Sequence, residues 1–265
     1  YSAVANGSGV YSIAGLTPAA GDVVTAYLDT NGGNTAVTIT RVAGAGGFLG
    51  LNLYQNEVIV RYEDAGPTTN TNLGQYDNDD DADINFTSNV GTLTVLNSNT
   101  LYVMTGKTLT PGGNVTTPNL KIVGTMDAGS NTITASGSGT PVTITGTFTP
   151  GTSTFQYTST SATNITATTY NALSLLPAGT VTYTLGTGAS QTIQTNGAFT
   201  IGNGTNAVTL TAATYNPTIN ITGDLTIAAN AVYTKGTGIT TFQKNAATQT
   251  LTDNTAAKQD LGTVQ

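Results

Sequence analysis

The chain has 265 residues, of which 57 are threonine and 32 are glycine, and its seven basic and fourteen acidic residues give a formal net charge of −7. So few basic residues cannot build the basic face that a nucleic-acid partner needs, and no nucleic-acid binding is expected. There is no histidine and no cysteine, which removes imidazole bases, thiolate nucleophiles and thiolate metal sites. No apolar run reaches membrane-spanning length, so no membrane insertion is expected.

Threonine and glycine together indicate the fold class. Threonine is β-branched and suits a half-buried pleated surface, while glycine at this level supplies tight turns. No window offers the i, i+3, i+4 apolar spacing of an amphipathic helix. The sequence therefore predicts an all-β protein.

The first part of the chain, residues 1–88, predicts a β-sandwich-like head with an N-terminal strand. A strand is expected over residues 10–16, and residues 22–42 have the pattern of a hairpin with an Asn- and Gly-rich turn. Further strands are expected over 51–54 and 58–62. These runs contain little threonine repetition, which distinguishes the head from the rest of the chain.

The remainder, residues 89–265, contains weak internal echoes. A Thr-Phe-Gln motif, a motif ending in Thr-Tyr-Asn and a Thr-Pro-Gly motif each occur twice. Their spacings lie near two or four units of twenty-odd residues, as expected for stacked supersecondary units. The echoes pair 154–156 with 241–243, 167–171 with 212–216, and 108–112 with 147–151.

Within one unit the apolar residues alternate with threonine and glycine. Val181, Tyr183 and Leu185 are typical, and the short runs are separated by turns such as Gly-Thr-Gly. A unit of about twenty residues then holds two or three short strands, which predicts a β-solenoid (β-helix) over residues 89–265 with apolar side chains inside. A second β-sandwich requires the same alternation and stays an alternative.

A polar connection, residues 68–83, ends in the densest charge cluster of the chain. Asp77, Asp79, Asp81 and Asp83 alternate in a way that could bind calcium through carboxylate oxygens. The loop is not an EF-hand, because it lacks glycine at its sixth position and has Ser88 at the twelfth. The alternative is a solvated acidic loop.

The sequence offers few residues that could catalyse a reaction. The solenoid carries few carboxylates, and they lie far apart in the sequence, so we expect no enzyme; a polysaccharide-active β-helix enzyme would need two of them to meet across coils. They are Asp127, Asp224, Asp253 and Asp260.

A glycan-binding surface could use head tyrosines as stacking platforms, although tyrosine in strands more often serves packing. The candidates are Tyr54, Tyr62 and Tyr76.

The C-terminal residues 253–265 show no helix or polar repeat that would cover the end of a solenoid. We therefore expect either that the natural chain continues beyond Gln265 or that another subunit completes the sheet. Residues 1–16 are the natural candidate for such strand addition.

Several segments resemble very large, repetitive surface proteins of uncultivated bacteria. The similar stretches include Asp22–Asp29, Leu51–Glu63, Asp79–Ile84 and Thr105–Thr116. The resembling proteins carry Thr- and Gly-rich β-repeats similar to autotransporter and haemagglutinin solenoids. The resemblance implies secretion and a structural or adhesive role, and it brings no catalytic residues.

These observations lead to one expectation and one alternative. We expect an extracellular or cell-surface structural subunit that self-associates into a homopolymeric filament or fibre, by end-to-end β-stacking or strand addition. The alternative is an adhesin stalk or carbohydrate-binding protein with glycan or cell-surface contacts. Apart from possible calcium, no cofactor is expected.

Overall fold

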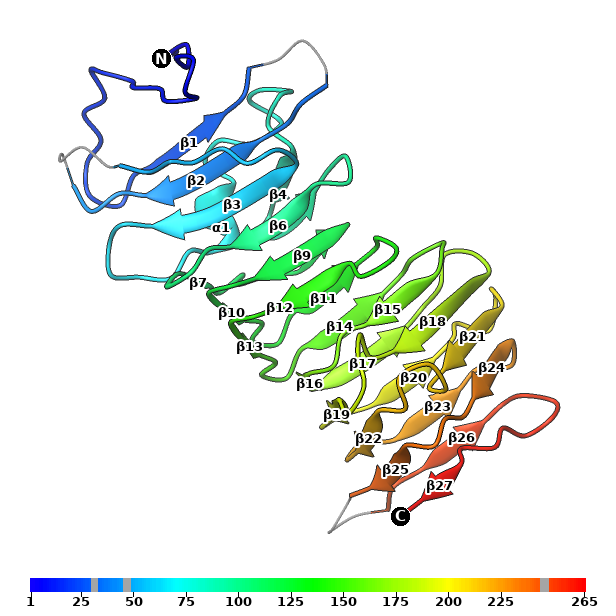
Figure 1. Cartoon of the computed structure of the whole chain (residues 1–265). Helices are drawn as coiled ribbons and strands as arrows, with labels where there is room; N and C mark the ends of the chain where they lie inside the picture. Colours follow the sequence, from blue (N-terminus) through cyan, green and yellow to red (C-terminus); the bar gives the residue numbers. More distant parts are fainter. Residues whose placement is uncertain (30–32, 45–48, 244–247) are drawn as a thin grey trace.

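The computed structural model describes residues 1–29, 33–44, 49–243 and 248–265, and it shows an elongated β-solenoid with the two termini at opposite ends (Figure 1). The described chain is all-β apart from the four-residue helix α1 (Asn70–Leu73). The predicted fold class is therefore confirmed. The first coils are built from three sheets, here named A, B and C, and the later coils from C, D and E.

Sheet C runs along the whole solenoid, whereas the other sheets cover one part of it. Sheet C contains β4 (Phe86–Asn89), β5 (Thr92–Val95), β8 (Val115–Thr117), β11 (Thr132–Ala135), β14 (Thr154–Tyr157), β17 (Ala172–Leu175), β20 (Phe199–Ile201), β23 (Leu225–Ile227) and β26 (Leu251–Asp253). Its strands pair in parallel except for the antiparallel pair β4–β5.

The N-terminal half uses two further sheets. Sheet A contains β1 (Val23–Tyr27), β2 (Val37–Arg41), β3 (Glu57–Tyr62), β6 (Thr100–Val103), β9 (Asn119–Ile122) and β12 (Val142–Ile144). Sheet B contains β7 (Thr108–Leu109), β10 (Thr125–Asp127) and β13 (Thr147–Thr149).

The C-terminal half uses sheets D and E in their place. Sheet D contains β15 (Thr163–Ile165), β18 (Val181–Leu185), β21 (Val208–Thr211) and β24 (Ala231–Thr234). Sheet E contains β16 (Thr169–Tyr170), β19 (Thr192–Thr195), β22 (Thr218–Ile221), β25 (Ile239–Phe242) and β27 (Thr263–Val264).

The register of sheet C shows that the coils differ in length. From β5 to β17 a longer step between partner residues alternates with a shorter one, whereas from β17 to β26 the steps are equal and longer than either. The column that defines these steps consists of Leu93, Val115, Ile133, Phe155, Leu173, Phe199, Leu225 and Leu251. Apart from Leu251, which is exposed, this column lies in the buried core, as the period-two alternation predicts.

The change in coil length coincides with an aromatic cluster in the core. The rings of Phe148 and Phe155 meet edge to face at 5.7 Å, and Tyr170 contacts both. Tyr157 joins the cluster through Phe155, with ring centroids 5.2 Å apart. Because sheets A and B end at β12 and β13, and D and E begin at β15 and β16, these large rings fill the core where the cross-section changes.

Glycines allow the turns of successive coils to stack closely. A Cβ placed on Gly223 would lie 2.1 Å from the carbonyl oxygen of Gly197, and one on Gly113 would lie 2.2 Å from that of Gly91. In both pairs the second glycine belongs to the preceding coil. Any side chain at Gly113 or Gly223 would therefore force the coils apart.

The predicted hairpin over residues 22–42 is confirmed by the antiparallel pair β1–β2, although residues 30–32 of its turn lie outside the described residues. The strand expected over 58–62 is β3. Two predicted strands are wrong: residues 10–16 and 51–54 form none. Both segments lie against the outer side of sheet A instead, where the hydroxyl of Tyr11 donates to the carbonyl of Leu51.

The two predicted parts of the chain share sheets. Residues 1–88 contribute β1, β2 and β3 to sheet A, which continues in parallel into β6 and β9, and β4 spans the predicted boundary at Ser88. The division into a head and a solenoid stays a prediction. No helix among the described residues is long and apolar enough to cross a lipid bilayer.

Candidate functional site

The acidic loop closes the N-terminal end of the solenoid core. Leu73 of α1 and Ile84 and Phe86 beyond the loop are fully buried within the same core as the coils. Thr69 caps α1 by accepting from the backbone N–H of Asn72, whose side chain in turn accepts from the N–H of Thr69. The helix and the loop therefore act as a lid over the first coil.

Asp77 organises this loop from within. Only 4% of the residue is exposed, and its carboxylate accepts from the backbone N–H of Asp79 at 3.0 Å and of Ser88 at 2.6 Å. Its own N–H donates to the carboxylate of Asp80 at 3.0 Å. A carboxylate accepts hydrogen bonds more strongly than a neutral oxygen does, so these bonds hold the loop backbone around Asp77.

Asp81 faces β1 rather than the other loop carboxylates. Its Oδ2 accepts from the hydroxyl of Tyr27 at 2.7 Å and its Oδ1 from the N–H of Asp83 at 3.0 Å. The bond from Tyr27 lowers the pKa of the Asp81 carboxyl and raises the pKa of the tyrosine hydroxyl. The loop is thus tied to sheet A by a charge-assisted hydrogen bond.

The four predicted calcium ligands have these separate roles, and no group of three acidic side chains arranged to hold a metal ion occurs within residues 1–29, 33–44, 49–243 and 248–265. Oxygen ligands for calcium need several donors converging on one point. Calcium binding by Asp77, Asp79, Asp81 and Asp83 stays a prediction.

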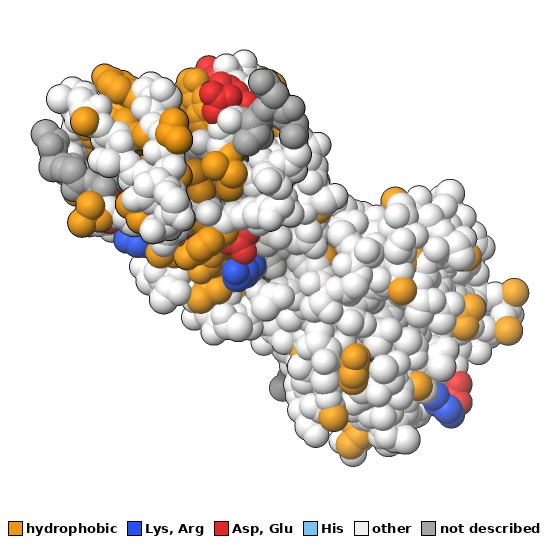
Figure 2. All heavy atoms as spheres, turned by 45° about the horizontal axis from the view of Figure 1, so that its top comes forward, with side chains coloured by type: hydrophobic (Ala, Val, Ile, Leu, Met, Phe, Trp, Pro, Cys, Tyr) orange, Lys and Arg blue, Asp and Glu red, His pale blue; other side chains and the backbone are white. Residues whose placement is uncertain are grey.

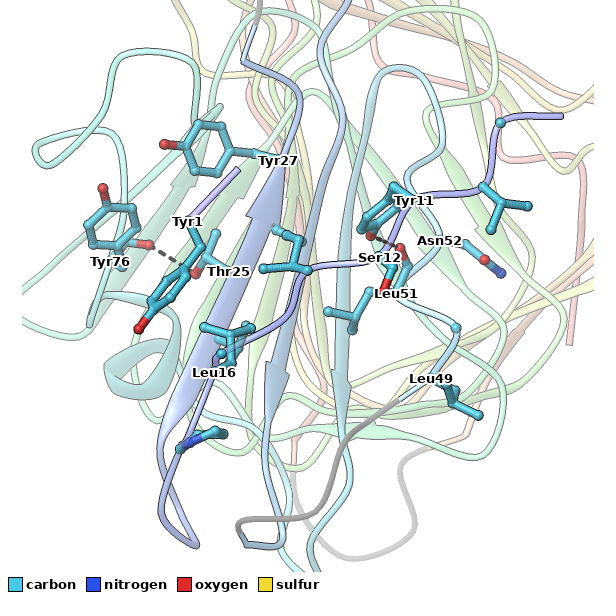
Figure 3. Close-up of a pocket in the computed structure, with 18 residues that line it drawn as sticks. Tyr1, Tyr11, Ser12, Leu16, Thr25, Tyr27, Leu49, Leu51, Asn52 and Tyr76 are labelled. Atoms are coloured by element: carbon cyan, nitrogen blue, oxygen red, sulfur yellow. Dashed lines mark hydrogen bonds between the residues drawn. The ribbon is translucent and has the colours of Figure 1, made fainter. Parts of the chain in front are cut away.

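A hollow of about 590 Å³ lies between the N-terminal segment and sheet A (Figure 3). Tyr1, Tyr11 and Leu16 line it from the segment, and Thr25 and Tyr27 line it from β1. Most of residues 1–20 are exposed. The segment therefore covers β1 loosely and leaves space beneath it.

The tyrosines proposed for glycan binding do not form one surface. Tyr76 is at the hollow, where its carbonyl accepts from the hydroxyl of Thr25, and Tyr62 has the ammonium of Lys107 over its ring at 5.0 Å. Tyr54 is half exposed and lies close enough to Lys121 to contribute, after Glu57, to the raised pKa of that lysine.

Around Tyr54 the outer face of sheet A carries a small cluster of charged and aromatic side chains. The ammonium of Lys121 lies 4.2 Å from the ring centroid of Tyr102 and 2.9 Å from the carboxylate of Glu57. The hydrogen bond from Lys121 to Glu57 raises the pKa of the lysine. Sequence reasoning missed this cluster because its members come from three different coils.

The carboxylates of the solenoid have structural partners and do not come together. Asp127 accepts from the N–H of Gly129, Asp224 from that of Thr250, and Asp253 from those of Thr255 and Gln259. Asp260 pairs with Lys235. Wherever a carboxyl pKa shifts within the described chain, it falls, as at Asp64, Asp81, Asp253 and Asp260, whereas a general acid near neutral pH needs a raised one.

In the described part of the chain the last coil ends two sheets, with β26 and β27, whereas β24 belongs to the coil before it and the backbone N–H of its Tyr233 already donates to Gln259 of the last coil at 2.8 Å. Leu251 of β26 and Val264 of β27 are about half exposed, at 49% and 50%. Parallel edges of this kind present unpaired backbone N–H and C=O groups to any further strand.

No family model matches the sequence, and no curated protein or solved structure shows significant similarity to the chain.

Proposed function

We propose that this chain is a structural subunit of an extracellular filament or surface fibre, in which copies join end to end through their β-sheets. The supporting observation is the last coil, where β26 of sheet C and β27 of sheet E present strand edges and half-exposed apolar side chains. A second copy that continued the sheets would satisfy those backbone groups and extend the core. On the face shown in Figure 2 the coils carry mainly polar, uncharged side chains.

The N-terminal segment is the part of the chain best suited to make the joint. Within residues 1–16 the side chains of Tyr1, Val4 and Val10 are 87%, 95% and 62% exposed. The hydrogen bond from Tyr11 to Leu51 is the only one that joins residues 1–16 to the rest of the described chain. Moving it costs few contacts. Pairing it with the edge of a neighbouring copy would bury the apolar side chains that are now in water.

Strand β26 offers a sharp test of this joint. The carbonyl of Thr250 and the N–H of Asn254 bond to β23, so by alternation the N–H of Leu251 faces the free edge. Among the described residues that N–H has no hydrogen-bond partner. Leu251→Pro therefore removes the donor without removing a bond seen within the chain, because proline has no backbone N–H. Leu251→Ala is the matched control, since it keeps the N–H.

Negative-stain electron microscopy of the full chain would score the result. We expect filaments from the unaltered chain and from Leu251→Ala, and short rods from Leu251→Pro and from a variant lacking residues 1–16. Rods from every protein would refute the filament. Filaments from Leu251→Pro would show that β26 is not the joint.

A second candidate, a glycan-binding surface protein, is favoured by the half-exposed ring of Tyr54 beside Tyr102 and Lys121. Aromatic rings of this kind can stack on sugar rings. In a glycan-binding assay Tyr54→Ala should abolish binding, whereas Tyr76→Ala, at the separate hollow, should not. Equal binding by Tyr54→Ala and the unaltered chain would remove this candidate.

A further inference from the structure

Three sheets end at the N-terminal end of the solenoid, and the chain itself covers two of their edges. Sheet B ends at β7, where Thr68 forms a parallel bridge with Leu109. Sheet C ends at β4, where the N–H of Ser88 donates to the Asp77 carboxylate at 2.6 Å. The carbonyl of Phe86 on β4 also accepts from the loop backbone, at 2.9 Å. Sheet A therefore has the open edge at this end of the described chain, at β1.

The outer edge of β1 carries backbone groups without partners. Asp22 and Leu28, which flank the strand, bond to the residues that flank β2, at 2.9 and 3.1 Å. Because antiparallel strands bond at alternate residues, the even-numbered residues of β1 also bond to β2. The remaining residues point their N–H and C=O groups away from β2, and within the described chain these groups have no hydrogen bond; they are Val23, Thr25 and Tyr27.

The hollow beside the N-terminal segment lies along this open edge (Figure 3). Residues 24–27 of β1 all line it, and consecutive residues of a strand point to opposite faces, so the space passes around the strand from one face to the other. One residue of a strand in a sheet takes up about 3.4 by 4.8 by 10 Å. The hollow of about 590 Å³ therefore holds a strand of about three to four residues.

An open strand of matching length lies at the other end of the molecule. Strand β26 has three residues, and the N–H of Leu251 faces its free edge. Strands β1 and β26 lie at opposite ends of one molecule and cannot meet within it (Figure 1). We propose that the edge of β1 receives β26 of a second copy, which enters the hollow and pairs with β1. This inference rests on the filament proposed above and names two strands of its joint, which leaves β27 to residues 1–16.

The distribution of charge favours this head-to-tail contact over a contact between two N-terminal ends. Residues 1–99 contain ten acidic and two basic side chains, whereas residues 100–265 contain four acidic and five basic ones. Two N-terminal ends would bring net charges of −8 and −8 together, whereas β1 against β26 brings −8 and +1 together. A head-to-tail contact also leaves one open end on each copy, so it repeats into a filament and does not close as a dimer.

The test blocks each side of the proposed strand pair. Thr25→Pro removes the N–H that faces the open edge of β1, a position where a strand tolerates proline because no bond within the described chain is lost. Thr25→Ala is the matched control, since it loses the same hydroxyl bond to Tyr76 and keeps the N–H. Leu251→Pro removes the matching donor of β26. Sedimentation velocity measures the size of each protein alone and of an equal mixture of the two proline variants.

We expect filaments from the unaltered chain and from Thr25→Ala, whereas each proline variant alone should need a concentration at least about tenfold higher to assemble. At a concentration where both proline variants are monomeric, their mixture should form pairs of one molecule of each. The last coil is intact in Thr25→Pro and β1 is intact in Leu251→Pro, so one joint can form. That pairing also shows that Thr25→Pro is folded.

Four results would overturn the inference. Filaments from Thr25→Pro at the concentration that suffices for Thr25→Ala would do so and leave the proposed filament standing. Pairs formed by Leu251→Pro alone would show that β1 meets β1, and a mixture that stays monomeric would show that β1 and β26 do not meet. Rods from the unaltered chain would refute the filament itself and this joint with it.

Discussion

The buried tyrosine hydroxyls at the change of coil length allow a quantitative prediction for Tyr170→Phe. The hydroxyl of Tyr170 donates to the carbonyl of Thr166 at 2.6 Å and lies 3.0 Å from the hydroxyl of Tyr157. Because Tyr170 uses its proton on Thr166, Tyr157 must donate within the pair, and it accepts from the N–H of Thr166 at 3.3 Å. The three residues form a closed ring of hydrogen bonds in the core.

Removing one hydroxyl from this ring leaves two buried groups unsatisfied, the carbonyl of Thr166 and the proton of Tyr157. Each such group costs about 1–3 kcal/mol, so Tyr170→Phe should lower the free energy of unfolding by about 3 kcal/mol. Tyr183→Phe is the matched control. Its hydroxyl donates to the carbonyl of Tyr157 at 3.0 Å, which keeps a second donor in the N–H of Leu176, so a loss of about 1 kcal/mol is expected.

Urea unfolding measures both variants. The chain has no tryptophan, so its fluorescence comes from its twelve tyrosines, among them the fully buried Tyr157, Tyr170 and Tyr183, and far-UV circular dichroism reports the sheets. Coincidence of the two curves checks that the unfolding is two-state. Equal losses in Tyr170→Phe and Tyr183→Phe would refute the argument, because both variants delete one buried hydroxyl and differ only in the groups left behind.

Three further predictions concern pH, turn stacking and the acidic loop. Burial raises the pKa of Tyr157 to about 12 from an ordinary value of 10.0, so its contribution to the free energy of unfolding is full below about pH 10 and is lost as the pH rises toward 12. Unfolding measured against pH should show this fall, and Tyr157→Phe should make it less steep without removing it, because burial also raises the pKa of Tyr170 and Tyr183. Gly223→Ala should lower the thermal midpoint, with a cost of about 1–3 kcal/mol, whereas Gly7→Ala, with open space around it, should leave it unchanged. Asp77→Ala should destabilise the lid formed by α1 and the acidic loop by about 2 kcal/mol, and Asp79→Ala by far less; hydrogen exchange of the α1 amides measures both. Added calcium should raise the thermal midpoint of the unaltered chain if the acidic loop binds it, and should leave the midpoint unchanged if it does not.

The internal echoes show how much of the arrangement of the coils can be predicted from sequence periodicity. Thr108 and Thr147 both pair with Thr125 in sheet B, so the Thr-Pro-Gly echo corresponds to a step of two coils. The Thr-Phe-Gln echo does not mark equivalent positions, because Phe155 lies in sheet C and Phe242 in sheet E. The unequal lengths of the coils, visible in sheet C alone, make equal spacing in sequence a poor guide to equal position.

Alternation alone determined that the protein is all-β with an apolar inside, because side chains point to opposite faces at every step of a strand. It could not determine what lies beside a strand. The segments at 10–16 and 51–54 have strand-like residues, yet they lie over sheet A without pairing. Strand pairing depends on which backbone edges are free nearby, and only the tertiary structure decides that.

The same distinction applies to the candidate sites. The sequence shows the acidic loop, because its aspartates are adjacent, but not that Asp77 faces inward and Asp81 faces Tyr27. The cluster of Lys121 with Tyr102 and Glu57 is invisible in the sequence, since its members are separated by whole coils. Composition and alternation are local properties that can be read from the sequence, whereas the register between strands is set by the packing of one coil on the next.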